Sequence, residues 1–96
     1  MPTEEKRQNK IMPCLVELKR TAEKELEQLP AKIHDRIVDV LFSLKENPLP
    51  HGVNKLHGRE GFRIRVGDYR ILYIYSEREK KAEVFSIAHR KDVYRL

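Results

Sequence analysis

The stretch FRIRVGDYRILYIY, residues 62–75, constrains the fold more than any other part of the chain. Phe62, Ile64 and Val66 alternate with two arginines, which is the pattern of a half-buried strand. A Gly-Asp pair, a two-residue turn signal, follows directly and leads into a second apolar run. The segment therefore predicts two paired antiparallel strands with an apolar face that needs a cover.

Two helical segments precede this hairpin and predict that cover. Apolar residues recur at helical spacing along the second segment, at Ile33, Ile37, Val40, Leu41 and Leu44. This helix is expected to stop before Pro48, because the residue preceding a proline is pushed out of the helical region. A shorter helix is predicted from an N-cap at Thr21 to the interruption at Pro30. Neither helix is expected to be stable without a sheet to pack on.

Two further strands complete the predicted order. Ile11 to Leu18 is short, apolar and contains Pro13, which suits a strand near a sheet edge. Ala82 to His89 follows a charged turn and predicts the last strand. We expect an α+β domain of order β-α-α-β-β-β, with a helical hairpin on one face of a small, largely antiparallel sheet. Residues 1–10 are polar and predict a disordered or extended tail, so residues 11–96 form the single domain.

The net charge of +5 is concentrated in the second half of the chain. Residues 1–50 hold 9 Lys/Arg and 9 Asp/Glu, whereas residues 51–96 hold 11 and 6. An electropositive face of this kind suits a polyanion such as nucleic acid or an acidic protein. Ordinary solubility charge would also account for the excess.

Several classes of protein are not expected from this sequence. Cys14 is the single cysteine, which excludes an internal disulfide and a cysteine-based zinc site. His34, His51 and His57 lack metal-ligand spacing, so neither a metal nor a cofactor is predicted. No glycine-rich phosphate loop or serine nucleophile elbow occurs. Apolar runs are too short for a membrane helix or signal peptide, so we expect a cytoplasmic protein without membrane contact.

The polar side of the hairpin carries candidate phosphate ligands. Arg63 and Arg65 lie on the same side of their strand, and Arg70 begins the next strand. Guanidinium groups bind phosphate bidentately and stabilise charge that builds on phosphorus. Arg90, His89 and Tyr94 end the chain and add a cation and two groups able to move protons. A solvent-facing charged strand, a structural histidine and a packing tyrosine would explain the same residues.

Three segments resemble the RelE branch of the RelE/ParE toxin superfamily of toxin-antitoxin systems. They are KLHG at residues 55–58, FRIRVGDYRILYIY at residues 62–75 and IAHRKDVY at residues 87–94. The resemblance implies a ribosome-dependent endoribonuclease that cuts mRNA in the decoding site and so inhibits translation. It also implies attack by the ribose 2′-hydroxyl, giving a 2′,3′-cyclic phosphate and a 5′-hydroxyl, with no metal or cofactor.

The resemblance assigns roles to particular residues. Arg63 and Arg65 stand where the best-known member has lysines, and would stabilise the phosphorane rather than accept a proton, because arginine stays protonated. Arg70 would bind the scissile phosphate, with help from Arg90. The general base would then be His89, Tyr94 or the substrate's surroundings, and the tyrosine would also stack on or bond to the substrate. The remaining RNA-binding candidates are Lys55, His57 and Lys91.

The resemblance also implies partners and leaves two other functions open. The expected partners are mRNA, the ribosome and a cognate antitoxin that wraps the toxin in a toxin-antitoxin hetero-oligomer. The same scaffold serves ParE-like inhibitors of DNA gyrase, which perform no chemistry of their own. A catalytically inert RNA-binding domain is the third hypothesis.

Overall fold

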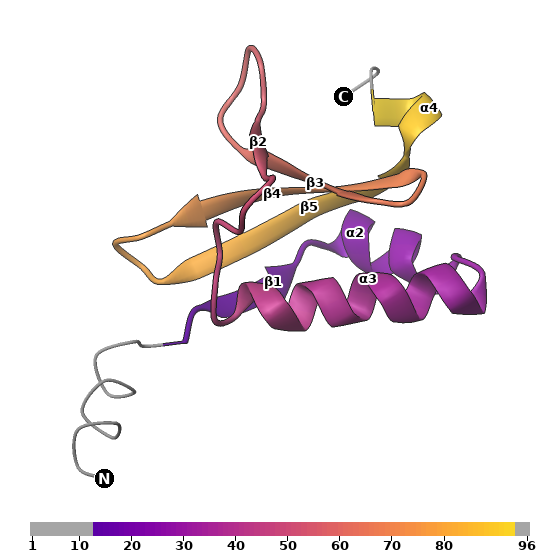
Figure 1. Cartoon of the computed structure of the whole chain (residues 1–96), viewed down its shortest axis with the longest axis horizontal. Helices are drawn as coiled ribbons and strands as arrows, with labels where there is room; N and C mark the ends of the chain where they lie inside the picture. The colour runs from indigo at the N-terminus through magenta and orange to yellow at the C-terminus, as the bar shows by residue number, and fades with distance from the viewer. Residues whose placement is uncertain (1–12, 94–96) are drawn as a thin grey trace, which may run out of the picture.

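A five-stranded sheet lies at the centre of the computed structural model, which describes residues 13–93 (Figure 1). In the order of the sheet, β1 pairs in parallel with β5, and all other neighbouring strands are antiparallel. The predicted, largely antiparallel sheet is thus confirmed. From one edge to the other the strands are β1 (Leu15–Leu18), β5 (Lys81–His89), β4 (Tyr69–Ser76), β3 (Phe62–Val66) and β2 (Asn54–Lys55).

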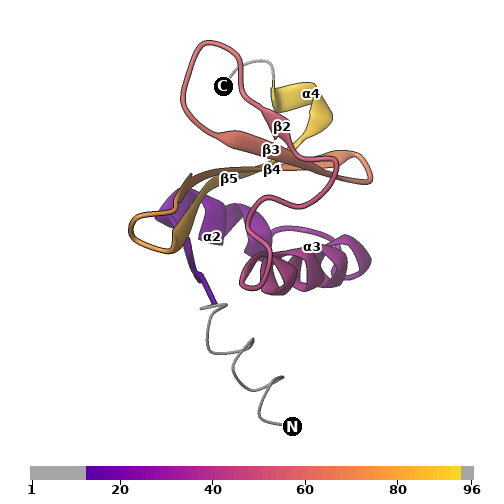
Figure 2. The ribbon, with the colours of Figure 1, turned by 60° about the vertical axis from the view of Figure 1, so that its left-hand side comes forward.

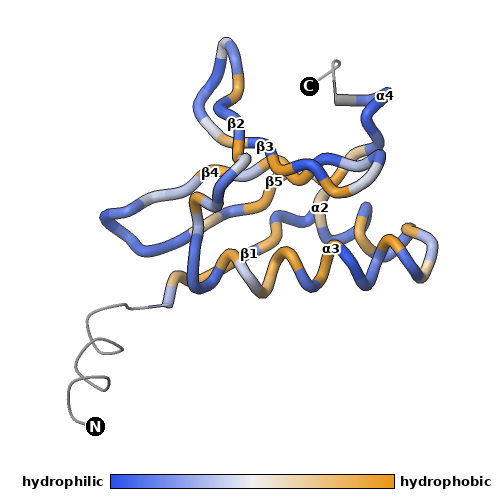
Figure 3. Tube along the Cα trace, viewed as in Figure 1, coloured by the Kyte–Doolittle hydropathy of each residue, from blue (hydrophilic) through white to orange (hydrophobic). Residues whose placement is uncertain are grey.

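Two helices, α2 (Arg20–Glu27) and α3 (Ala31–Leu44), cover one face of the sheet (Figures 1 and 2). The helical periodicity of α3 explains its position, because Ile37, Leu41 and Leu44 are all buried. This confirms the predicted α+β architecture with a helical hairpin on one face. Along the chain, hydrophobic residues recur through α3 and the strands, whereas the β4–β5 turn is hydrophilic throughout (Figure 3).

The core between helices and sheet is built from alternate strand residues. Tyr73 at its centre is fully buried, and its hydroxyl donates a hydrogen bond of 2.6 Å to the carbonyl of Pro48. Burial raises the pKa of the Tyr73 phenol, and the nearby Cys14 adds a smaller effect in the same direction. This hydrogen bond ties the segment after α3 to the middle of the sheet.

The structure differs from the sequence predictions at several element ends. The N-cap of α2 is Lys19 rather than Thr21, which lies inside the first turn. Strand β1 begins at Leu15, because the backbone N–H of Cys14 bonds to the carbonyl of Lys45 instead of joining the sheet. The proposed tail, residues 1–10, lies outside the described residues. Two short elements, β2 and α4 (Arg90–Val93), were not predicted.

A β-bulge in β5 changes which residues face the helices. Tyr73 of β4 lies opposite Val84, and the preceding Leu72 lies opposite Ser86, so Phe85 is an extra residue. A shift of one residue exchanges the two faces of a strand. Ala82 and Val84 point into the core before the bulge, and the core position after it is Ile87 rather than Ser86 or Ala88. By the same alternation His89, opposite Tyr69, belongs to the helix-covered face.

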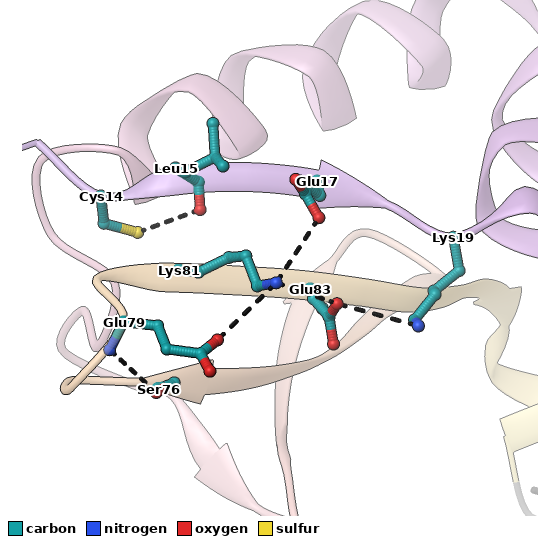
Figure 4. A network of polar contacts seen from close by, with 8 residues as sticks. All are labelled: Cys14, Leu15, Glu17, Lys19, Ser76, Glu79, Lys81 and Glu83. Carbon is teal, nitrogen blue, oxygen red and sulfur yellow. Dashed lines mark hydrogen bonds and ion pairs between the residues drawn. The ribbon is translucent and has the colours of Figure 1, made fainter.

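The other face of the sheet lacks a helical cover and is called the open face below. At its β1–β5 end, Lys81 lies between three carboxylates, with Nζ–O distances of 3.5 Å to Glu83, 3.7 Å to Glu79 and 3.8 Å to Glu17 (Figure 4). Glu83 is the largest cause of the raised pKa of Lys81. The ion pairs link β1 to β5 and to the β4–β5 turn, and the three carboxylates offset the positive charge of Lys81.

Candidate nucleic-acid interface

Three arginines lie close together on the open face because of the β3–β4 register. Arg65 lies directly opposite Arg70, and Arg63 lies opposite Leu72, two residues further along. Cross-strand partners share a face, so all three side chains stand on the side away from the core residues Ile64 and Val66. Like charges directly opposite each other destabilise a sheet. An anion bound between Arg65 and Arg70 would remove that cost.

The Gly67-Asp68 turn between β3 and β4 holds two of the predicted site arginines. Nη1 of Arg70 donates to the carbonyls of Tyr69 at 3.0 Å and Gly67 at 3.3 Å. The carbonyl of Asp68 accepts the backbone N–H of Arg90 at 2.7 Å, and the Asp68 carboxylate lies 3.9 Å from Nε of Arg90. One turn therefore sets the positions of Arg70 and Arg90 relative to each other.

Both unpredicted elements stand on the side of the sheet opposite the helices. Figure 1 shows β2 with the loop that follows it, and α4, rising on this side from different parts of the sheet. The loop carries Arg59, whose Cζ lies over the ring of Phe85 at 4.3 Å from its centroid. Sequence reasoning missed Arg59, since its partner Phe85 is 26 residues away in the chain and no local pattern links the two residues. The two elements border the arginines of the open face.

The RNA-binding candidates are divided between different places. Lys55 of β2 lies opposite Phe62, so it shares the side of that core-facing residue, and it lines with Arg59 a hollow of about 420 Å³ between the loop and β3. His57 is exposed in the same loop, and Lys91 is exposed on α4. The structure thus does not gather the three residues: Lys55 lies on the side of Phe62, and the other two lie on separate elements.

His89 does not join the arginines. Its ring meets Tyr69 edge-on, with centroids 5.2 Å apart, and its Nδ1 accepts the backbone N–H of Lys91 at 3.2 Å. It lines a cavity of about 380 Å³ together with Lys24 and Glu25 of α2, on the helix-covered face. The bulge in β5 is the reason, since uninterrupted alternation from Ala82 would have turned His89 to the open face. Tyr94 lies outside the described residues.

A comparison with protein families shows to which family the chain belongs. A family model described as the ParE toxin of type II toxin-antitoxin systems, parDE, matches residues 16–94. The chain belongs to the RelE/ParE superfamily of toxins. The toxin is 34% identical over 86 residues to Toxin RelE of Mycobacterium tuberculosis (strain ATCC 25618 / H37Rv), covering 88% of this chain and 89% of that protein. Toxin RelG of the same strain is 33% identical over 86 residues, covering 88% and 99%.

Solved structures agree with this RelE-like assignment. The toxin superposes on a chain of the RelBE2 toxin-antitoxin complex from M. tuberculosis with a TM-score of 0.73 and 28% identity, covering 81% of this chain and 99% of that chain. For the archaeal RelE-RelB complex from Pyrococcus horikoshii OT3 the TM-score is 0.73 and the identity 27%, covering 82% and 97%. This protein is a RelE-like toxin of a type II toxin-antitoxin system.

The described part of the toxin offers fixed charges for binding. Among residues 13–93, no three His, Cys, Asp or Glu side chains gather in a way that could hold a metal ion. No helix in the same residues is long and apolar enough to cross a membrane. The open face carries the guanidinium groups of Arg63, Arg65 and Arg70, which can bind phosphate oxygens and favour added negative charge on them.

Proposed function

We propose that this toxin is a ribosome-dependent endoribonuclease that cleaves mRNA in the decoding site and thereby stops translation. The observation that carries the proposal is the direct opposition of Arg65 and Arg70 on the open face, beside Arg63. Two guanidinium groups at neighbouring cross-strand positions match a phosphodiester whose charge rises during cleavage. The 34% identity to Toxin RelE supports the RelE branch.

The proposed reaction is an intramolecular transesterification of RNA. The ribose 2′-oxygen forms a bond to the adjacent phosphorus, the bond to the 5′-oxygen breaks, and a 2′,3′-cyclic phosphate and a 5′-hydroxyl result. Arg70 binds the scissile phosphate, while Arg63 and Arg65 stabilise the phosphorane and Arg90 assists. The proton of the 2′-hydroxyl has to leave to a group other than these arginines, which stay protonated. His89 lies on the helix-covered face, so the proposal assigns this role to Tyr94 or to the ribosomal surroundings of the message.

An antitoxin partner is the second part of the proposal. The solved relatives with TM-scores of 0.73 are complexes of RelE with RelB antitoxins. We expect a cognate antitoxin to wrap this toxin in a hetero-oligomer and to place acidic side chains against the open face. Inhibition would then be both steric and electrostatic, because the antitoxin occupies the phosphate-binding arginines.

The test is cleavage of a defined mRNA on translating ribosomes, with 5′ ends mapped by primer extension. Arg70→Ala is expected to lower the cleavage rate about 10²- to 10³-fold, the loss found when one preorganised donor to a transition state is removed. Arg78→Ala is the matched control, since Arg78 is exposed on the β4–β5 turn at the other end of the sheet. Cleavage by Arg70→Ala at the wild-type rate would contradict the assigned role of Arg70.

Inhibition of DNA gyrase is the alternative, because the matching family model is described as the ParE toxin. The two functions separate in parallel assays of mRNA cleavage and of gyrase-catalysed supercoiling. Intact mRNA together with blocked supercoiling would establish the ParE-like function instead. Under that outcome the toxin would act by binding alone, and Arg70→Ala would have no cleavage to lose.

A further inference from the structure

Phe85 lies on the open face at the bulge in β5, because it follows the core residue Val84 and side chains alternate along a strand. Its neighbours Val84 and Ile87 belong to the buried core, whereas the Phe85 ring is half-buried and lies beneath Arg59 of the β2–β3 loop. A phenylalanine on an uncovered sheet face exposes apolar surface unless something packs on it. Here the guanidinium group of Arg59 packs on the ring, with its Cζ 4.3 Å from the ring centroid.

The loop that carries Arg59 is held close to the sheet. The backbone N–H of Leu56 donates to the carbonyl of Gly61 at 2.9 Å, which closes the loop at its base. Gly61 has a φ of +135°, and a Cβ there would lie only 2.9 Å from Leu56 Cδ1 and 3.0 Å from the Tyr73 carbonyl oxygen. Glycine is therefore required for this close approach. The loop base fixes where Arg59 enters the open face.

Arg59 remains exposed although its Cζ lies over the Phe85 ring. Guanidinium is planar, weakly hydrated and able to stack on a second flat group. The Arg59 guanidinium group therefore rests on an aromatic ring, keeps accessible surface, and lies next to the sheet face that carries the other arginines. Unpaired RNA bases stack on aromatic side chains and on arginine planes in this way.

The distance to the phosphate-binding arginines suits one continuous strand of RNA. Across the sheet, Arg63 lies opposite Leu72, and Leu72 lies opposite Ser86, the residue next to Phe85. Two strand spacings of about 4.8 Å put Phe85 roughly 10 Å from Arg63. A nucleotide whose phosphate lies at Arg63 or Arg70 would have its own base, or that of a neighbour, within reach of Arg59.

We propose that Arg59, backed by Phe85, is a stacking platform for one unpaired base of the RNA that the open face binds. The proposal rests on the proposed function in one respect, that the ligand is single-stranded RNA. The platform binds the base through its flat face, so it selects for an unpaired nucleotide without selecting for a particular base. It adds a base contact to a site that otherwise holds the sugar-phosphate backbone.

The test is a double-mutant cycle between protein and RNA, read out as binding rather than cleavage. A short single-stranded oligonucleotide of 2′-O-methyl nucleotides, which lack the attacking hydroxyl, is prepared with an abasic site at each position in turn. Removing one particular base is expected to weaken binding to the wild-type toxin about tenfold, within the range found for single stacking contacts. The same base should make no difference to Arg59→Lys, which keeps the charge and loses the plane.

Two further variants separate stacking from a purely structural role of the loop. Phe85→Leu keeps an apolar side chain under Arg59 and removes the ring, and it is expected to lose the same base preference. Arg78→Lys is the matched control and should behave as wild type. Melting temperatures identify variants in which the loop contact only stabilises the fold: a lowered melting temperature with the base preference intact would overturn the platform.

The remaining outcomes decide between ligands and between proposals. No binding of any oligonucleotide by the wild-type toxin would overturn the platform, as would unchanged RNA binding by Arg59→Lys with weakened antitoxin binding, which would assign Arg59 to the antitoxin. A toxin that does not cleave mRNA on ribosomes but shows the base preference would refute the endoribonuclease and keep the platform. Cleavage of mRNA without any base preference would support the endoribonuclease and refute the platform.

Discussion

Tyr73 combines a fully buried ring with a hydroxyl that is bonded to the backbone. The ring packs at a tilt on Phe62, with centroids 5.8 Å apart, and the hydroxyl donates to the Pro48 carbonyl. A buried polar group is tolerated only when its hydrogen bond is made. Tyr73 therefore couples the strand that carries Arg70 to the segment that leaves α3.

Replacing Tyr73 with phenylalanine should destabilise the toxin by about 1–3 kcal/mol. The Pro48 carbonyl loses its donor, and the phenyl ring that remains next to it cannot replace the hydrogen bond. Urea denaturation measures the change. Tyr75→Phe is the control, since it makes the same chemical change at a half-buried tyrosine on the same strand. Equal stability of the Tyr73 and Tyr75 variants would show that the 2.6 Å hydrogen bond contributes nothing measurable.

The buried phenol of Tyr73 also predicts a loss of stability in alkali. Its folded pKa lies above the ordinary value of 10.0, so above pH 10 the unfolded chain releases a proton that the folded chain retains. The contribution is complete below pH 10 and declines as the pH rises, by at most about 1.4 kcal/mol per pH unit. Denaturation of wild type and Tyr73→Phe between pH 9 and about 11.5 checks this. If the free energy of unfolding fell with pH equally in the two proteins, the Tyr73 phenol would not be the cause of the loss.

Glu25 shows how a helix can complete a strand. β1 ends at Leu18, opposite Val84, while β5 continues to His89. Beyond that end the Glu25 carboxylate on α2 accepts the N–H of Ile87 at 2.7 Å and the hydroxyl of Ser86 at 3.2 Å. One side chain thus accepts the backbone N–H of Ile87, which a longer β1 would have paired, and also satisfies the Ser86 hydroxyl.

Glu25→Ala should therefore cost about 1.5–3 kcal/mol, the range for a hydrogen bond to a charged group. Glu25→Gln should cost less, because an amide oxygen still accepts. Hydrogen exchange at the Ile87 amide gives the local measurement, and faster exchange is expected in the alanine variant. Glu27→Ala, an exposed change on the same helix, is the control. Unaltered exchange at Ile87 in Glu25→Ala would contradict the bond.

The elements that sequence patterns predict are those defined by local periodicity. The α3 helix and the β3–β4 hairpin follow from apolar spacing and a Gly-Asp turn, and the hairpin register places Arg63, Arg65 and Arg70 together. Elements of two and four residues, β2 and α4, are too short to carry such a signal. The bulge at Phe85 depends on pairing between strands, and the contact of Arg59 with Phe85 joins two distant segments, so neither the face of His89 nor the position of Arg59 could be predicted from one segment.

The positive charge of the toxin is distributed unevenly along its open face. Arginines occupy the β3–β4 end, whereas Lys81 at the β1–β5 end is surrounded by three carboxylates. A polyanion is therefore drawn to one end of the sheet and finds little attraction at the other.

This distribution predicts the salt dependence of RNA binding. Log K against log salt falls by about 0.7 for each phosphate neutralised on a single strand, so four arginines give a slope near −3. The four are Arg63, Arg65, Arg70 and Arg90. Arg65→Gln should reduce the steepness by about 0.7, and Arg78→Gln should not change it. Fluorescence titrations over a range of salt concentrations measure both, and identical slopes for the two variants would contradict a localised site.

The strand order affects when the sheet can form as the chain is synthesised. β5 is the last of the described strands along the chain, yet β1 and β4 both pair with it, so β1 cannot join the other strands until residues 81–89 have been made. Contacts between the two ends of a chain also close slowly. The segment that forms β1, although it is made early, therefore stays unpaired until residues 81–89 are available, and the sheet forms as one unit rather than strand by strand.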